Sequence, residues 1–190
     1  MIWVAISGSW RISTAPENDP VRVEVNNAVV TATEILLKYG HGIVTGGALG
    51  VDFWATEKAM SCNSCGSPAL KIILPTSLEI FLAHHDARAA EGKITVAAAQ
   101  ALRELLVAVK LAVPPARFIE MAHTVCTTHT LYDRNTQVVT QADALLAFQV
   151  NGTGGTQDAI DKAHAQDKPT RVVAFAHPTL HQRASLVPPS

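Results

Sequence analysis

The stretch Ile43-Val-Thr-Gly-Gly-Ala-Leu-Gly-Val-Asp52 decides the fold. It passes directly from a short apolar run, through small residues, to a segment that reads as the start of a helix. An apolar run bounded by glycine predicts a strand that is buried on both faces, as in parallel sheets. The glycines of the turn let the backbone approach an anion closely, and the helix start adds N–H donors and a positive dipole end.

The same succession of strand, small-residue loop and helix recurs along the chain. Short apolar runs predict strands at 2–6, 43–45, 70–74, 144–150 and 170–176. Helical spacing predicts helices at 21–39, 51–60, 131–141 and 156–166, and a long helical stretch at 77–113 that is broken near Gly92. The segment 117–121 fits a strand or a helix. This alternation predicts an α/β, Rossmann-like, doubly wound and mostly parallel sheet with helices on both faces.

The pattern predicts a single domain at 1–176, in which 77–113 is a helical insertion. Residues 177–190 contain three prolines and no periodicity, which predicts a mobile C-terminal tail. Alanine and leucine dominate the insertion, and the insertion is longer than a crossover between strands requires. We therefore expect it to form the face of a homodimer or a higher homo-oligomer.

The composition narrows the class of protein. Hydrophobic residues make up 48% of the 190 residues and charged residues 16%, which predicts a folded chain. The net charge of −1 argues against a dedicated duplex-DNA binder, which usually has a basic face. No apolar run reaches the roughly 18 residues of a membrane span, and no signal peptide is visible. We therefore expect a cytoplasmic protein that does not contact a membrane.

The cysteines and histidines predict neither a metal site nor a cofactor. Cys62 and Cys65 form a C-x-x-C, which can be a zinc half-site or a redox pair, but free thiols in a surface turn are the favoured interpretation. Cys126 and His129 can complete four zinc ligands, although they lie some sixty residues further along the chain. No histidine pair shares a helical face with a carboxylate convincingly; the histidines considered are His84, His85, His123 and His129.

Three predicted strands are followed by loops of small residues, mostly glycine, serine and threonine. The carboxyl ends of parallel strands share the edge of the sheet where ligands bind. The chain lacks G-x-G-x-x-G and G-x-x-x-x-G-K-[ST] in the required place, which argues against an ordinary NAD site and a P-loop NTPase. The carboxylate of Asp52 either interacts favourably with the helix dipole or accepts a hydrogen bond from a ribose hydroxyl. Glycine also serves tight turns without any ligand. The candidate phosphate-binding residues of the three loops are Ser7, Gly8, Ser9, Gly46, Gly47, Ala48, Gly152, Gly154, Gly155 and Thr156.

The order of these motifs resembles the SLOG superfamily. That superfamily joins the DprA-type DNA-processing proteins, the LOG-type cytokinin-activating phosphoribohydrolases and the molybdenum-cofactor carrier proteins. The resemblance covers about 1–176 and rests on segments 2–9, 42–52, 133–135, 142–148 and 152–156. It implies a Rossmann-like fold and a ligand that carries phosphate.

The resemblance is closest to the DprA-type branch. Segment 46–52 is similar to its G-x-A-x-G-[IV]-D loop, and Arg134-Asn135 is similar to its R-N-R segment, in which the arginine reaches towards phosphate. The resemblance therefore adds Arg134 and Asn135 to the candidate binding residues. Thr136 stands in place of the second arginine. Trp10 stands where the first loop of that branch often has arginine, and Arg11 follows it; the ring of Trp10 either stacks on a base or packs in the protein.

The LOG-type motif P-G-G-x-G-T-x-x-E would fall at 151–159. Gly155-Thr156 match its G-T pair, but Ala159 occupies the position of its catalytic glutamate. Asp158 is adjacent in sequence, although it would point about 100° around the helix. The sequence thus favours a nucleotide or nucleotide-derivative binding protein, a sensor or a carrier, over an enzyme. The alternatives are a LOG-like nucleoside-monophosphate phosphoribohydrolase and single-stranded DNA binding as in DprA.

Overall fold

The computed structural model describes residues 1–62 and 68–180. These residues form one six-stranded sheet in which every neighbouring pair of strands is parallel, in the order β4-β3-β2-β1-β5-β6. The predicted α/β, Rossmann-like class is confirmed. Segment 117–121, which fitted a strand or a helix, contributes an edge strand. The strands are β1 (Trp3–Gly8), β2 (Gly42–Thr45), β3 (Leu70–Thr76), β4 (Phe118–His123), β5 (Ala144–Val150) and β6 (Thr170–Phe175).

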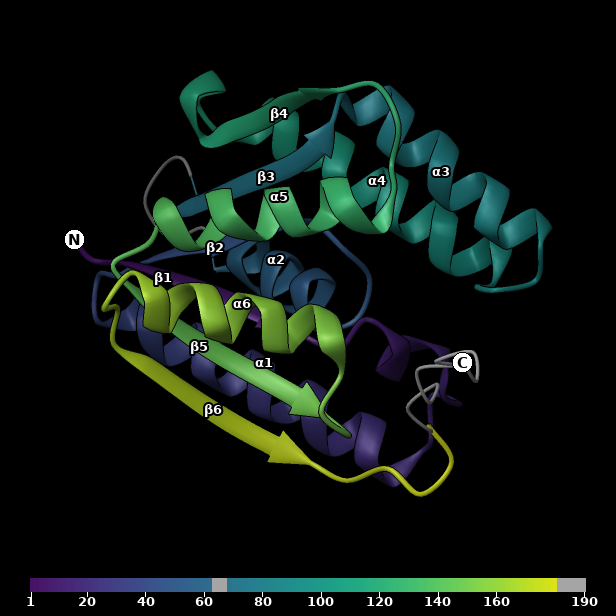
Figure 1. Cartoon of the computed structure of the whole chain (residues 1–190), viewed down its shortest axis with the longest axis horizontal. Helices are drawn as coiled ribbons and strands as arrows, with labels where there is room; N and C mark the ends of the chain where they lie inside the picture. The colour runs from purple at the N-terminus through teal and green to yellow at the C-terminus, as the bar shows by residue number, and fades with distance from the viewer. Residues whose placement is uncertain (63–67, 181–190) are drawn as a thin grey trace, which may run out of the picture.

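Helices cover both faces of the sheet. In Figure 1, α5 and α6 lie in front of the sheet, α1 and α2 lie behind it, and α3 and α4 pack against each other beyond its β3 side. The predicted stretch 77–113 is this α3–α4 pair. The helices are α1 (Pro20–Lys38), α2 (Val51–Ser61), α3 (Leu78–Ala90), α4 (Val96–Ala112), α5 (Thr128–Thr140) and α6 (Gly154–Ala165), with short 3-10 turns at Arg11–Thr14 and Pro115–Arg117.

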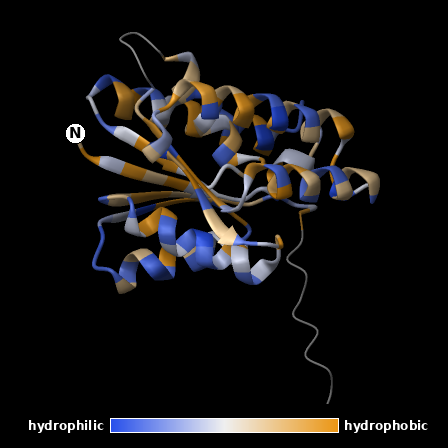
Figure 2. Ribbon diagram, turned by 90° about the horizontal axis from the view of Figure 1, so that it is seen from above, coloured by the Kyte–Doolittle hydropathy of each residue, from blue (hydrophilic) through white to orange (hydrophobic). Residues whose placement is uncertain are grey.

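The sheet separates two apolar layers, because successive side chains of a strand point to opposite faces. In β2, Ile43 packs in the larger layer, under α1 to α4, and its neighbour Val44 packs in the smaller layer, under α5 and α6. Apolar segments accordingly run through the middle of the molecule while polar segments lie towards the outside (Figure 2). In the described residues, no helix is both long enough and apolar enough to cross a bilayer.

The chain reverses its direction across the sheet at β1. It proceeds from β1 through β2 and β3 to β4, and β5 then returns to the other side of β1. In open α/β sheets, ligands bind in the crevice at such a switch point, outside the carboxyl ends of the strands. The loops that follow β1 and β5 therefore border the crevice that the fold provides for a ligand.

Two expected boundaries are wrong. Helix α6 begins at Gly154 with Thr153 as its N-cap, two residues before the expected start at Thr156. The tail was expected to start at His177, but His177 is only 6% exposed, and its backbone N–H donates to Asn151 Oδ1 at 2.9 Å. Its Nε2 lies 3.1 Å from an Asp19 carboxylate oxygen, which fastens this segment to the start of α1. The remaining tail at 181–190, and Cys65 of the C-x-x-C pair, lie outside the described residues.

Candidate functional site

The loops after β1 and β5 hold each other through hydroxyl groups. Ser9 Oγ lies 2.6 Å from Thr153 Oγ1 and accepts a hydrogen bond from the backbone N–H of Val150 at 3.0 Å. Thr153 Oγ1 lies 3.1 Å from Thr156 Oγ1, and Thr156 is buried. The hydroxyls of Ser9 and Thr156, both expected to meet a ligand, are thus engaged within the protein. They fix the shape of the switch-point crevice.

The end of β1 needs a residue without a side chain. Ser7 and Gly8 belong to the strand itself, where they pair with Ala147 and Phe148 of β5. A Cβ atom added to Gly8 would lie 2.5 Å from the carbonyl oxygen of Phe148 and equally close to Val51. The glycine therefore serves the close packing of β1, β5 and α2.

The loop after β2 is closed by a carboxylate of the chain itself. Asp52, in the first turn of α2, accepts hydrogen bonds from the backbone N–H of Gly46 at 3.0 Å and of Ala48 at 3.4 Å, both at Oδ2. Gly47 has φ +64°, and a Cβ atom there would lie 2.8 Å from Leu74. Two of the N–H groups expected to hold a phosphate therefore already hold a carboxylate.

Arg134 of α5 is buried against this closed loop. Its side chain is 8% exposed, and its Nη1 lies 3.5 Å from Asp52 Oδ2, which is an ion pair without a hydrogen bond. A Cβ atom on Gly46 would lie 1.3 Å from Nη1, so the guanidinium rests on the bare Cα of that glycine. Nε and Nη1 are buried and have no hydrogen-bond partner among the residues that the structure describes.

The charges of Arg134 and Asp52 are only partly compensated. Burial lowers the pKa of Arg134 and raises the pKa of Asp52, because the loss of hydration outweighs the attraction between the two groups. A buried charge is costly unless it is both paired and hydrogen-bonded. The arrangement leaves unused N–H donors on a buried cation.

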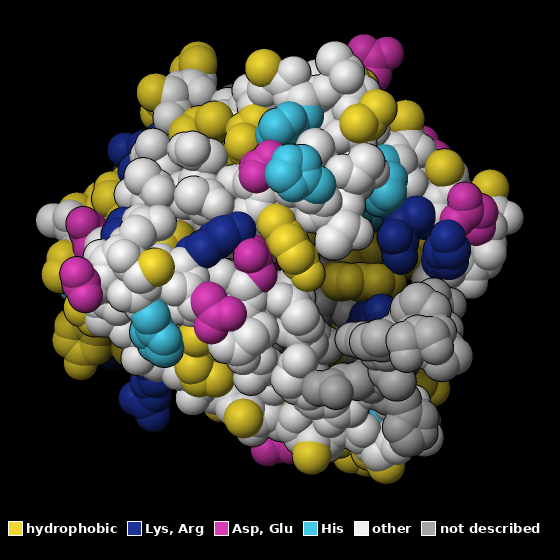
Figure 3. All heavy atoms as spheres, viewed as in Figure 1, with side chains coloured by type: hydrophobic (Ala, Val, Ile, Leu, Met, Phe, Trp, Pro, Cys, Tyr) yellow, Lys and Arg dark blue, Asp and Glu magenta, His cyan; other side chains and the backbone are white. Residues whose placement is uncertain are grey.

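A small cavity of about 80 Å³ adjoins Arg134. The guanidinium of Arg88, on α3, lies 4.7 Å from the ring centroid of Trp10. His85, also on α3, is 9% exposed, and burial lowers its pKa to about 4. The polar or aromatic side chains around the cavity are Trp10, His84, His85, Arg88, Cys126 and Arg134. The space-filling view shows a hollow on this side of the molecule, beyond the amino ends of α5 and α6, with hydrophobic and basic side chains in its walls (Figure 3).

The amino end of α6 is open. The helix starts with Gly154 and Gly155, and Thr153 gives no side-chain cap to its first N–H groups. A Cβ atom on Gly155 would meet nothing within 4 Å. Unlike the loop after β2, this helix start presents N–H groups that no carboxylate of residues 1–62 and 68–180 closes. Gly152, in the turn before it, has φ +61°, which suits glycine.

Asn135 links α5 to this helix start. Its Nδ2 donates to the carbonyl oxygen of Gly155 at 3.2 Å and to Asp158 Oδ2 at 2.9 Å. Asp158 also pairs with Lys162 at 2.8 Å. Asn135 and Asp158 therefore position the segment instead of facing a ligand. Ala159 is 1% exposed in the smaller apolar layer, so the position of the LOG-type glutamate carries no carboxylate and faces the core.

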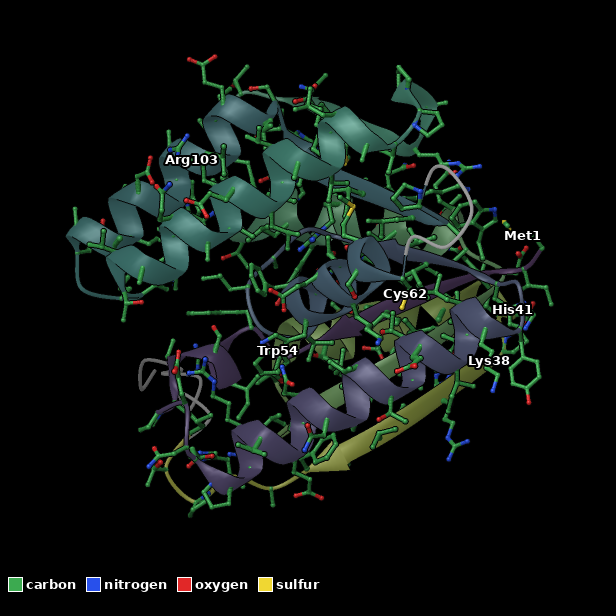
Figure 4. The ribbon with its side chains drawn as sticks, turned by 180° about the vertical axis from the view of Figure 1, so that it is seen from behind. Met1, Lys38, His41, Trp54, Cys62 and Arg103 are labelled. Carbon is green, nitrogen blue, oxygen red and sulfur yellow. The ribbon has the colours of Figure 1, made fainter. Side chains whose placement is uncertain are left out.

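The three predicted loops lie at the same edge of the sheet, but only some of their residues border a cavity. Of the expected site residues, Ala48 and Arg134 line the small cavity. A larger cavity of about 650 Å³ begins beyond Leu49 and Ile94, which border both cavities, and none of the expected site residues is among the described residues that line it. Trp54, beside α1 in the view from behind (Figure 4), forms part of its wall.

The sequence interpretation did not identify His85 and Arg88 as site residues. Both follow Phe81 at helical spacing, so one face of α3 brings them to the same cavity. The histidines were weighed as metal ligands, and no cluster of three His, Cys, Asp or Glu side chains in residues 1–62 and 68–180 is arranged to hold a metal. His123 and His129 instead lie 3.4 and 3.5 Å from Asp133.

Comparison with known proteins identifies the fold. No protein-family model matches the sequence, and no curated protein matches it significantly. The X-ray structure of the structural-genomics target TM1055 superposes with a TM-score of 0.53 at 16% identity, over 90% of this chain and 72% of that one. DNA processing protein A of Helicobacter pylori, described for its single-stranded DNA binding mode, superposes with a TM-score of 0.60 at 22% identity. That match covers 90% of this chain and 64% of the other, so the chain spans about two thirds of that protein.

The likeness to both solved structures confirms the Rossmann-like fold that the sequence resemblance implied. At these identities the likeness concerns the course of the chain and not the chemistry of its ligand.

Proposed function

We propose that the protein binds a nucleotide or a nucleotide derivative, as a sensor or a carrier, with the phosphate held at the carboxyl edge of the sheet. The observation that carries this proposal is Arg134, a buried cation with two nitrogen atoms that lack a hydrogen-bond partner in the described residues. Its planar fork of donors suits phosphate oxygens, and charge-assisted bonds of this kind are roughly twice as strong as neutral ones.

The open helix start supplies the second part of the phosphate site. The N–H groups of Gly154 and Gly155 and the positive end of the α6 dipole favour an anion. Asn135, the neighbour of Arg134 in sequence, is bonded to Gly155, which places the middle of α5 beside the first turn of α6. The proposal therefore assigns phosphate to Arg134 and the loop after β5, and assigns the loop after β2 to holding Arg134.

Hydrolysis of a nucleoside monophosphate is the less favoured alternative. General acid–base work needs a carboxylate within hydrogen-bond reach of the reacting group. Ala159 supplies none, and Asp158 is already bonded to Asn135 and Lys162. We accordingly propose binding without catalysis.

Single-stranded DNA is the second candidate ligand. The ring of Trp10 with the guanidinium of Arg88, and the fold shared with DNA processing protein A, favour it, since aromatic rings stack on bases and arginines track the backbone. The net charge of −1 counts against it, because backbone binding gains most of its affinity from lysine and arginine.

The test is a titration of the parent and of Arg134→Ala with 5′-AMP and with a single-stranded oligonucleotide. Loss of a charge-assisted hydrogen bond, about 1.5–3 kcal/mol, lowers the affinity for AMP roughly tenfold to a hundredfold. The matched control is Arg103→Ala, since Arg103 is a half-buried arginine that lies outside both cavities and pairs with Asp86. Equal binding of AMP by Arg134→Ala and the parent would refute the phosphate site, and a strong preference for the oligonucleotide would favour the second candidate.

The proposal extends to the organisation of the protein, as a single domain that works in the cytoplasm as a homodimer. The α3–α4 pair supports the dimer, because Val96, Val107 and Leu111 of α4 are 73%, 42% and 84% exposed. Apolar side chains exposed along one helix suit a contact between copies. A monomer in light scattering at micromolar concentration would exclude this part of the proposal.

A further inference from the structure

The ring of His85 has a fixed direction in the cavity beside Arg134. Its Nδ1 lies 2.9 Å from the backbone carbonyl oxygen of Phe81, one turn earlier in α3. A carbonyl oxygen can only accept a hydrogen bond, so Nδ1 carries the proton. In the neutral imidazole the other nitrogen, Nε2, then bears the lone pair and can only accept.

The surroundings keep this ring neutral. His85 is 9% exposed, and the charged or titratable groups near it are Arg88, Arg134 and His84. Positive neighbours and burial both disfavour an imidazolium, which lowers the pKa of His85 to about 4. His85 therefore keeps its lone pair at neutral pH.

The lone pair of Nε2 has no hydrogen-bond partner in the described part of the chain, although His85 borders the cavity. Of the other polar side chains around the cavity, His84 also carries an imidazole, and three carry only donors. The guanidinium groups of Arg88 and Arg134 and the indole N–H of Trp10 can only donate. The cavity thus combines donors for an anion with an acceptor that is open to a donor from the ligand.

We infer that His85 is a specificity residue whose Nε2 accepts a hydrogen bond from a sugar hydroxyl of the ligand, while Arg134 holds the phosphate of the same ligand. This inference rests on the proposed phosphate site and narrows the ligand to a phosphorylated sugar with a free hydroxyl. The cavity measures about 80 Å³, so the hydroxyl lies only a few bonds from the phosphate. The ribose hydroxyls of a nucleoside 5′-phosphate satisfy this requirement.

The experiment compares 5′-AMP with 2′,3′-dideoxy-5′-AMP, which keeps the phosphate and the base and lacks both hydroxyls. Isothermal titration of the parent is expected to show roughly tenfold tighter binding of AMP, the effect of one hydrogen bond of about 1.4 kcal/mol. His85→Phe keeps a ring and removes the acceptor, so it should bind both nucleotides with the affinity that the parent has for the dideoxy form. His85→Gln places an amide oxygen near the position of Nε2 and should restore part of the preference.

The control is His129→Phe, because the His129 side chain is 84% exposed and lies outside the cavity; it should keep the full preference. Equal binding of the two nucleotides by the parent overturns the inference without any variant, and so does a preference that survives in His85→Phe. If the parent binds neither nucleotide, the proposed function fails and this inference fails with it. If both bind equally and Arg134→Ala binds neither, the phosphate site stands and only the role of His85 is refuted.

Discussion

The loops after β2 and β5 look alike in sequence and differ in the structure. Both are rich in glycine, and both lead into a helix at the carboxyl edge of the sheet. The loop after β2 folds around the carboxylate of Asp52, which takes the N–H groups of Gly46 and Ala48. The loop after β5 leaves the first N–H groups of α6 without a side-chain cap.

The difference teaches that a glycine-rich loop is not by itself a phosphate site. Glycine lets a backbone wrap around any anion, and that anion can belong to the chain. In the loop after β2, the carboxylate of Asp52 also attracts Arg134, whose guanidinium rests on Gly46. The loop after β2 thus holds the guanidinium of Arg134 in place. We assign the loop after β5 and Arg134 together to the binding of the ligand.

The largest effect is expected where the loop after β2 loses the carboxylate of Asp52. Asp52→Ala leaves Arg134 as a buried charge without its partner and leaves two backbone N–H groups without an acceptor. Breaking a buried ion pair on one side costs about 3–5 kcal/mol of unfolding free energy. Urea unfolding at neutral pH measures this loss directly.

The matched control for Asp52→Ala is Asp161→Ala on α6. Asp161 is exposed and accepts a hydrogen bond from the side chain of Gln157. The control should change the unfolding free energy by no more than about 0.5 kcal/mol. Should Asp52→Ala lose as little as Asp161→Ala, the loop after β2 does not depend on the carboxylate of Asp52 and the contrast between the two loops disappears.

The fold was predictable from the sequence because its signals are local. Short apolar runs bounded by glycine or proline marked most of the strands, and Gly92 marked the break between α3 and α4. The edge strand β4 was ambiguous because its side chains alternate between half-buried and exposed positions, which gives no continuous apolar run. The start of α6 was misplaced because Thr153 and Thr156 both have the composition of a cap.

The site was less predictable because its contacts are non-local. The contact of Asp52 with Gly46 is local but was not among the roles considered for Asp52, and the approach of Arg134 depends on how α5 packs across the sheet. His85 and Arg88 come from α3, which the sequence presented as an apolar insertion. Their meeting with Trp10 needs the loop after β1 and the α3–α4 pair in their final places.

The pH dependence of stability also distinguishes the two loops, because the buried His85 of α3 borders the same cavity as Arg134, which the loop after β2 holds. The unfolded chain protonates His85 near the ordinary pKa of 6.5, whereas folding lowers that pKa to about 4. Between these values the unfolded state binds more protons, so the unfolding free energy falls as the pH falls from 6.5 to about 4. At about 1.4 kcal/mol per pKa unit the loss approaches roughly 3 kcal/mol.

The measurement is urea unfolding of the parent and of His85→Phe at about pH 7 and about pH 4.5. The phenylalanine variant lacks the titrating group and should lose less stability than the parent on acidification. His129→Phe, at an exposed position, should follow the parent. Parallel losses in the parent and in His85→Phe would mean that acid acts elsewhere in the protein.

The smallest expected effects come from glycine substitutions. A substitution in the loop after β5 should change ligand binding alone, whereas one in the loop after β2 should change the stability of the fold. Gly155→Val places a side chain where a Cβ meets nothing within 4 Å, so the free protein should keep its unfolding free energy. The same side chain obstructs the approach of a phosphate to the α6 N–H groups, which should weaken AMP binding by about tenfold, or 1.4 kcal/mol.

Gly47→Ala is the counterpart in the loop after β2. Its φ of +64° and a Cβ 2.8 Å from Leu74 predict a loss of about 1–3 kcal/mol in unfolding free energy. AMP affinity should fall less than in Gly155→Val, since Gly47 holds the loop and not the ligand. Gly155→Ala, with a smaller side chain, should lie between the parent and the valine variant in affinity. If Gly155→Val binds AMP as the parent does while Gly47→Ala loses affinity, the assignment is reversed: the phosphate sits on the loop after β2, in competition with Asp52, and the open start of α6 is only a turn.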